Sequence, residues 1–167
     1  MKNILLILLF IPIFSFSQLI EIEPVYKTLP EHMIKDINGK SINTTDLTHC
    51  GPIVISFWAT WCSPCKKELA ALDEIYEDLK KEYGIKIVTI SIDDEKTKNL
   101  VKPYVNGKGW EFEYLLDPNG DFKRLMGVNN VPHTFLIDKE RNIVYSHNNY
   151  TPGDEDKLVE QIKNLKK

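Results

Sequence analysis

The pattern of apolar and polar residues along the chain predicts buried strands alternating with amphipathic helices. Residues 53–58 form a largely apolar run rich in β-branched side chains, which is typical of a central strand covered on both faces. From Pro64 to Tyr83, apolar residues recur at spacings of three and four between Lys, Glu and Asp, which predicts a helix. Gly84 is expected to end this helix, and residues 85–92 predict a second buried strand.

The rest of the chain continues this alternation and closes with a hairpin and a helix. Further elements are predicted in the order helix, strand, helix, strand, strand and helix, at residues 93–106, 112–116, 122–126, 134–138, 143–147 and 154–167. Pro103 is expected to interrupt the first of these helices, and Asp154 or a neighbouring residue to cap the last. Upstream, residues 33–41 predict a β-hairpin that turns at Asn38-Gly39.

This order of elements predicts the fold class. Alternating strands and helices followed by two adjacent strands give an α/β fold, with a central mixed sheet, helices on both faces and an N-terminal β-hairpin extension. The 167 residues suit one domain, because domains typically contain about 100–200 residues. We expect that domain to span residues 31–167.

The N-terminal segment has the layout of a secretory signal peptide. Lys2 precedes an apolar stretch, and the small residues Ser15 and Ser17 occupy positions −3 and −1 of a cut after Ser17. The stretch is shorter than the roughly 20 residues of a transmembrane helix. We therefore predict a signal peptide at residues 1–17, an N-terminal arm at residues 18–30, and an exported, periplasmic protein that is membrane-tethered if the signal stays uncleaved.

Composition and charge narrow the classes of function. Hydrophobic residues make up 43% of the chain and charged residues 27%, as in an ordinary globular protein. The 21 basic residues are scattered among 24 acidic ones, with a net charge of −3, so the sequence lacks the basic stripe of a nucleic-acid-binding protein. We expect no nucleic-acid partner, no cofactor, no bound metal and a monomer.

The cysteines carry the candidate chemistry. There are three of them, an odd number, and Cys62 and Cys65 lie close together between a predicted strand and a predicted helix. Backbone N–H groups and the dipole at a helix N-terminus stabilise negative charge, so we expect the pKa of the Cys62 thiol to fall. Cys65 lies one helical turn further on the same side, and Pro64 suits the first turn because it has no N–H.

This geometry predicts thiol–disulfide exchange by Cys62 and Cys65, which form the predicted redox disulfide. The Cys62 thiolate attacks a substrate disulfide and forms a mixed disulfide, and Cys65 then attacks Cys62 and releases the reduced substrate. The same steps run backwards oxidise a dithiol, so the residues alone leave the direction open.

Two segments of the chain resemble the thioredoxin superfamily. Residues 57–68, FWATWCSPCKKE, resemble the active-site segment of thioredoxin-like proteins, and most closely that of the exported TlpA/ResA-type group. Residues 131–138, VPHTFLID, resemble the cis-proline segment of the superfamily and follow in the order that it has. The resemblance covers roughly residues 30–165 and implies a thioredoxin-like fold, with the helix at residues 93–106 that the TlpA/ResA group also carries.

The resemblance implies roles for residues around the cysteines. Pro132 would be cis and pack beside the disulfide, which leaves the Val131 backbone free to pair with an extended substrate peptide. Trp61 would contact the substrate, whereas Trp58 is expected to pack in the core. His133 would lie at the rim of the site, where it either fills space or tunes the thiolate. The predicted substrate-binding residues are Trp61, Val131, Pro132 and His133.

Glu68 matches an acidic residue that follows the CxxC motif in TlpA/ResA-type proteins. It lies three residues after Cys65 on the same helical face, where a partly buried carboxylate could take or return the Cys65 proton. Thioredoxins proper have an acidic residue in the preceding strand, where this chain has Ser56, which favours Glu68 for this role. The plainer interpretation makes Glu68 a solvated helix residue, like Lys66 and Lys67.

The resemblance also implies a function. The protein would reduce disulfides in exported proteins with oxidised cysteines, with apocytochrome c in cytochrome c maturation as one candidate. Its electrons would come from a membrane or periplasmic thiol donor. This direction is taken from the TlpA/ResA-type group and not from the residues themselves.

Other functions stay open as alternatives. One is a peroxiredoxin-like thiol peroxidase, a second is a copper or zinc carrier on the same fold, and a third is a binding module with an inert disulfide. A zinc site would need two ligands besides the cysteine pair, and His49 and Cys50 are the nearby candidates. Otherwise Cys50 is expected to be a small buried residue rather than a third redox thiol.

Overall fold

The structure is a computed structural model that describes residues 28–47 and 50–165. The predicted signal peptide at residues 1–17, most of the predicted arm at residues 18–30 and the candidate ligand His49 lie outside the described residues. Among the described residues, every helix is too short or too polar to span a bilayer.

A seven-stranded mixed sheet forms the centre of the molecule, with the strand order β2-β1-β5-β4-β3-β6-β7. The strands are β1 (Met33–Asp36), β2 (Ser41–Asn43), β3 (Ile53–Trp58), β4 (Lys86–Ser91), β5 (Glu113–Leu116), β6 (His133–Ile137) and β7 (Ile143–Asn148). Strand β3 pairs in parallel with β4 and antiparallel with β6, and β4 pairs in parallel with β5. The predicted mixed sheet is confirmed, and the hairpin of β1 and β2 joins it through antiparallel pairing with β5.

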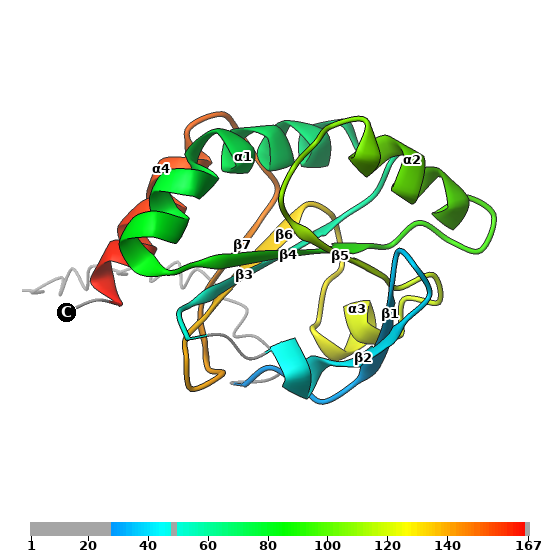
Figure 1. The fold of residues 1–167 in the computed structure, drawn as a ribbon, viewed down its shortest axis with the longest axis horizontal. Helices are drawn as coiled ribbons and strands as arrows, with labels where there is room; N and C mark the ends of the chain where they lie inside the picture. Colours follow the sequence, from blue (N-terminus) through cyan, green and yellow to red (C-terminus); the bar gives the residue numbers. More distant parts are fainter. Residues whose placement is uncertain (1–27, 48–49, 166–167) are drawn as a thin grey trace, which may run out of the picture.

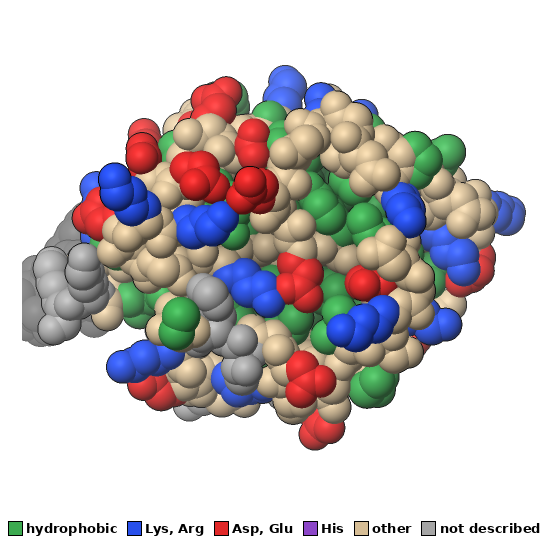
Figure 2. All heavy atoms as spheres, in the orientation of Figure 1, with side chains coloured by type: hydrophobic (Ala, Val, Ile, Leu, Met, Phe, Trp, Pro, Cys, Tyr) green, Lys and Arg blue, Asp and Glu red, His purple; other side chains and the backbone are tan. Residues whose placement is uncertain are grey.

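Helices cover both faces of the sheet, as predicted. They are α1 (Ser63–Tyr83), α2 (Val101–Asn106), α3 (Asp121–Leu125) and α4 (Asp154–Asn164), with 3-10 turns η1 (Thr44–Leu47) and η2 (Lys98–Leu100). Helices α1, α2 and α4 lie on one side of the sheet, and α3 lies on the other beside the β1–β2 hairpin (Figure 1). On the face shown in Figure 2, basic and acidic side chains occur next to one another.

Strand β3 divides the core into two layers. All six of its residues are buried, as its continuous apolar run predicts. Because side chains alternate across a strand, Val54 and Trp58 pack in the core under α1, whereas Ile55 and Phe57 pack in the core on the α3 side. The strand therefore lies between two apolar layers, and α1 begins shortly after its end, at Ser63.

Helix α1 follows its predicted bounds closely. Its buried residues Leu69, Leu72, Tyr76 and Leu79 recur at three- and four-residue spacing and face the sheet. The helix ends at Gly84, whose positive φ of 63° suits glycine and whose N–H donates to the Lys80 carbonyl.

Three predicted helix details differ from the structure. The helix expected at residues 93–106 begins only at η2, because the carboxylate of Asp93 is buried in contacts described below instead of capping a helix. Pro103 is the third residue of α2, in the first turn where a missing N–H costs nothing, so it does not interrupt the helix. Helix α4 has Gly153 at its N-cap with no side-chain cap, and the Asp154 carboxylate accepts the Thr151 N–H instead.

Candidate active site

The Cys62–Cys65 disulfide lies where β3 gives way to α1, as the sequence predicts. The two Cα atoms are 5.3 Å apart, and Cys62 is the N-cap residue of α1. Its Sγ accepts the Cys65 N–H at 3.2 Å, and Pro64 stands in the first turn. The sulfur of Cys62 thus occupies the position at which a helix N-terminus binds negative charge.

The surroundings of the disulfide distinguish its two sulfurs. Cys65 is fully buried at 0% exposure and Cys62 retains 5%, so Cys62 is the residue that a partner reaches first. Next to it, Trp61 is 62% exposed and accessible to a partner. Trp58 is 0% exposed and packs against Tyr104 in the core, as predicted.

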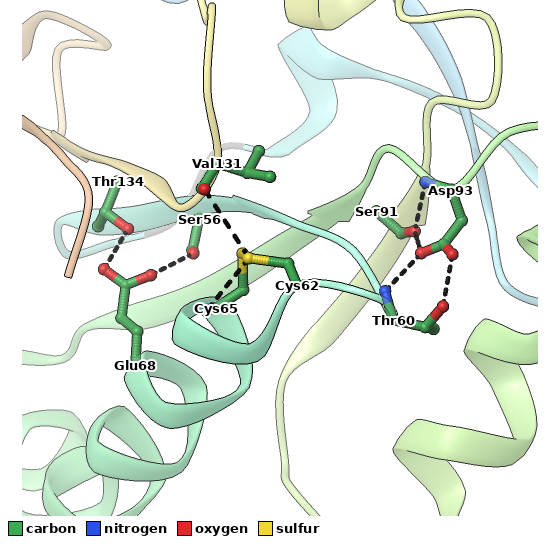
Figure 3. The surroundings of a disulfide bond; sticks show 9 residues. All are labelled: Ser56, Thr60, Cys62, Cys65, Glu68, Ser91, Asp93, Val131 and Thr134. Atoms are coloured by element: carbon green, nitrogen blue, oxygen red, sulfur yellow. Dashed lines mark hydrogen bonds between the residues drawn. A yellow bond between two sulfur atoms is a disulfide. The ribbon is translucent and has the colours of Figure 1, made fainter.

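The Val131-Pro132 segment faces the disulfide from the start of β6. The peptide bond between these residues is cis, as expected from the resemblance. The Val131 carbonyl oxygen lies 3.8 Å from the Cys62 Sγ (Figure 3). The backbone of this segment therefore borders the sulfur that a substrate would approach.

Glu68 is a buried carboxylate one helical turn below Cys65. It is 2% exposed, so the interpretation as a solvated helix residue is wrong. The side chain is also buried more deeply than the partial burial that was expected. Its Oε2 accepts the Ser56 hydroxyl at 3.0 Å and its Oε1 accepts the Thr134 hydroxyl at 2.8 Å (Figure 3). Ser56, the residue that departs from thioredoxins proper, is thus a direct partner of the carboxylate.

A histidine completes the contacts of Glu68. The Nε2 atom of His147, on the edge strand β7, lies 3.0 Å from Glu68 Oε1. The His147 side chain is 15% exposed and that of Glu68 is 3% exposed. The sequence analysis missed His147. The pattern that could have indicated it is the two-residue spacing from Tyr145, which places both side chains on the same face of β7.

A second buried carboxylate fixes the loop that leads to Cys62. Asp93 is 1% exposed and accepts hydrogen bonds from the Thr60 N–H at 2.8 Å, the Thr60 hydroxyl at 2.5 Å and the Ser91 hydroxyl at 2.7 Å (Figure 3). Sequence reasoning assigned Asp93 to a helix and missed this contact. The carboxylate ties the end of β4 to the residues just before the cysteine motif.

His133 lies on the other face of β6 from Thr134. Its ring stacks on Phe135 with centroids 4.4 Å apart, and it pairs in register with Phe57. Burial, with a smaller effect of His147, lowers the pKa of His133 to about 4. Its contacts therefore favour the space-filling interpretation over the tuning of the thiolate.

The structure contradicts the expectation for Cys50. Cys50 is exposed and not buried, and it lines a groove together with Tyr83 and Lys139. Within residues 28–47 and 50–165, no three His, Cys, Asp or Glu side chains converge as a metal site requires.

The disulfide does not line the cavity that lies beside the β1–β2 hairpin. A cavity of about 930 Å³ lies between β1, α2 and the loop after β5. None of the predicted site residues lines this cavity.

Comparison with known proteins assigns the family. The family model described as AhpC/TSA matches residues 25–146, most of the chain and both motifs. The chain belongs to the AhpC/TSA family. Relatives of this AhpC/TSA protein include the thiol-disulfide oxidoreductase ResA of Bacillus thuringiensis, 36% identical over 118 residues. That match covers 71% of this chain and 66% of the relative, just under two thirds of its length.

Solved structures confirm the thioredoxin-like fold of this AhpC/TSA protein. An uncharacterized thioredoxin-like protein from Porphyromonas gingivalis has a TM-score of 0.75 and 43% identity, covering 84% of this chain and 92% of its own. A Chlorobium tepidum protein described as a "putative Thiol:disulfide interchange protein DsbE" has a TM-score of 0.72 and 27% identity, covering 83% of this chain and 95% of its own. The resemblance to the TlpA/ResA-type group is thereby confirmed.

Proposed function

We propose that the protein is a thiol–disulfide oxidoreductase that reduces disulfides of exported proteins. The observation that carries the proposal is the Cys62–Cys65 disulfide at the N-terminus of α1. The Val131-Pro132 backbone borders this disulfide, and the buried Glu68 lies one helical turn after Cys65. Relatives named for this activity and a structural neighbour named for disulfide interchange support it.

In the reductive direction, the cycle starts from two reduced cysteines. The Cys62 thiolate attacks one sulfur of a substrate disulfide, which forms a mixed disulfide, and the other substrate sulfur leaves as a thiolate and takes a proton. Interaction with the N-terminus of α1 stabilises the attacking thiolate. Val131 and Trp61 are the proposed contacts of the substrate chain on either side of the sulfur.

The second step closes the disulfide. The Cys65 thiol gives its proton to Glu68, and its sulfur attacks Cys62 Sγ, so the bond to the substrate breaks and the second substrate sulfur leaves as a thiolate. Once this thiolate takes a proton from water, the products are the Cys62–Cys65 disulfide and a substrate dithiol. A thiol donor then reverses these steps and restores the two reduced cysteines.

The setting of this activity is part of the proposal. Residues 1–17 are proposed to direct export to the periplasm, with a membrane tether if they stay attached. Exported proteins with oxidised cysteines, apocytochrome c among them, are the proposed substrates, and a membrane or periplasmic thiol donor is the proposed source of electrons. A measured reduction potential near the roughly −120 mV of DsbA would contradict the reductive direction.

Trapping with a single-cysteine variant tests the activity. With Cys65→Ser, the mixed disulfide with insulin or an oxidised peptide should accumulate, because the residue that releases the substrate is gone. Mass spectrometry should find the substrate on Cys62, and the matched Cys62→Ser variant should trap far less. No adduct on Cys62, together with no insulin reduction by the reduced wild type, would refute the proposal. A full first turnover of Cys65→Ser with hydrogen peroxide would favour the peroxidase alternative.

The rate of the second step, measured separately from the first, tests the proposed role of Glu68. Glu68→Gln should slow the release of substrate from the mixed disulfide by about 100-fold at neutral pH, because the proton acceptor is lost. The attack by Cys62 should stay within about twofold. Stopped-flow measurement of the two steps across pH separates them, and Glu74→Gln on the exposed face of α1 is the matched control. Equal pH profiles for wild type and Glu68→Gln would remove Glu68 from the reaction.

A further inference from the structure

The two oxygens of the buried Glu68 carboxylate have unequal surroundings. Oε1 is contacted by both the Thr134 hydroxyl, at 2.8 Å, and His147 Nε2, at 3.0 Å. Oε2 is contacted by the Ser56 hydroxyl, at 3.0 Å. A proton on the carboxyl group therefore meets different partners depending on the oxygen that carries it.

The surroundings of His147 determine which of its nitrogens carries a proton. Its Nδ1 is buried and, in the part of the chain that the structure describes, has no hydrogen-bond partner. A doubly protonated imidazole would leave a buried N–H unsatisfied there, which is costly. The neutral tautomer with a proton on Nε2 avoids this cost and donates to Glu68 Oε1.

The hydroxyl of Ser56 differs from this fixed N–H. A hydroxyl rotates and serves as a donor or an acceptor, so Ser56 can donate to an ionised Oε2 and accept from a protonated one. A proton on Oε1 would instead face the His147 N–H, which has no lone pair to offer. Figure 3 shows that the Ser56 side of the carboxylate is the side toward the disulfide.

We propose that His147 is a positioning residue that reserves Glu68 Oε2 for the proton of Cys65. This inference rests on the proposed function and adds a residue and an atom to it. As Cys65 attacks Cys62, the Cys65 S–H bond breaks, an O–H bond forms at Glu68 Oε2, and the Ser56 hydroxyl turns to accept it. His147 and Thr134 continue to donate to Oε1 throughout. When the disulfide is reduced again, the step runs in reverse and a proton on Glu68 Oε2 passes to the Cys65 sulfur.

Other titratable groups lie near Glu68 and His147, and several of them have charged or hydrogen-bonded partners of their own. They come from β6, β7, the loop after β7 and α4: His133, Tyr145, Tyr150, Asp154 and Lys157. Asp154 pairs with Lys157 at 2.8 Å, and the Tyr150 hydroxyl donates to Glu155. Burial raises the pKa of Tyr145 above its ordinary value, so this phenol stays neutral beside Glu68. The groups in direct contact with the Glu68 carboxylate are thus Ser56, Thr134 and His147.

Direct observation of Glu68 tests the role of His147. The carboxyl ¹³C resonance of Glu68, assigned by its absence in Glu68→Gln, is followed with pH in the oxidised protein. His147→Phe removes the donor, so ionised Glu68 loses stabilisation and the titration midpoint should rise by about one pH unit or more. His147→Gln keeps an N–H donor and should bring the midpoint back to within a few tenths of a unit. An unchanged midpoint in His147→Phe would overturn the proposal.

Two further variants test the assignment of the oxygens. Thr134→Val removes a donor to Oε1 and should raise the Glu68 midpoint in the same direction as His147→Phe. Ser56→Ala removes a partner of both the ionised and the protonated forms, so it should move the midpoint less. A larger upward shift in Ser56→Ala than in Thr134→Val would place the proton on Oε1 and refute the assignment.

These measurements separate the inference from the proposed function. The ¹³C titration needs no substrate, so it reports on His147 even if Cys62 shows no exchange. If His147→Phe does not fold, Thr134→Val carries the test at the other donor of Oε1. If the midpoints shift as expected but the rate of the Cys65 step does not follow them, the Glu68 mechanism fails while the hydrogen-bond assignment stands.

Discussion

At the scale of single residues, the site is built from polar groups that the fold buries with their partners. Glu68 is acceptable in the core because three donors replace the water that it loses. Asp93 is acceptable for the same reason, with donors from Thr60 and Ser91. Glu68 lies three residues after Cys65, and Asp93 holds Thr60, two residues before Cys62. Of the three buried acidic side chains in the described part of the chain, these two thus lie near the cysteine motif.

His133 predicts a pH dependence of stability. Its pKa is lowered to about 4 from 6.5 by burial, so the unfolded chain binds a proton more readily than the folded protein between these values. The contribution is fully present above about pH 6.5 and is lost as the pH falls toward 4. With allowance for partial exposure, we expect a loss on the order of 1–2 kcal/mol over this window.

Urea unfolding at several pH values checks this expectation. His133→Phe keeps a ring against Phe135 and cannot titrate, so its stability should fall less between pH 6.5 and 4 than that of the wild type. Parallel curves for the two proteins would show that His133 does not contribute.

At the scale of elements, periodic local patterns gave reliable predictions and isolated polar residues did not. The apolar run of β3 and the spacing in α1 each match the observed bounds to within one residue. The helix predicted at residues 93–106 starts later than expected. Asp93 in isolation is typical of a helix start, whereas in the structure its carboxylate accepts hydrogen bonds from Thr60. A local signal was overridden by a contact 33 positions away.

The close approach of two loops at Gly51 gives an element-scale prediction. A Cβ atom at Gly51 would collide with the Gly84 carbonyl, which is backbone and cannot move aside like a flexible side chain. Gly51→Ala should therefore lower the free energy of unfolding by about 1–3 kcal/mol. Gly107→Ala is the control, because a Cβ there meets carbonyl oxygens at an ordinary 3.5 Å. Equal denaturant midpoints for Gly51→Ala and wild type would contradict this account.

At the scale of the whole molecule, Arg141 joins the start of the described chain to the β6–β7 turn. Its guanidinium donates to the Leu29 carbonyl at 3.0 Å and to the Thr44 carbonyl at 3.3 Å. The Leu29 N–H donates in return to the Arg141 carbonyl at 2.9 Å. One side chain thus links residues that lie about a hundred positions apart in sequence.

Removing this link should loosen the N-terminal segment. Arg141→Asn tolerates the positive φ of 71° but lacks the guanidinium, so the local opening free energy at Leu29 should fall by about 1–2 kcal/mol. Hydrogen exchange of the Leu29 amide measures the effect. Lys139→Asn, at an exposed neighbouring position, should leave that exchange rate unchanged. An unaltered rate in Arg141→Asn would show that the segment is held by other contacts.

The sequence by itself determined the strands, the main helix and the place of the two sulfurs, because apolar periodicity and the order of strand, cysteine motif and helix are local. Tertiary structure alone decided that Glu68 is buried, that His147 contacts it and that Cys50 is exposed. Ser56, Thr134 and His147 lie 12, 66 and 79 positions from Glu68. They meet it because β3, β6 and β7 pair side by side under α1, and such pairing depends on packing that no local pattern records.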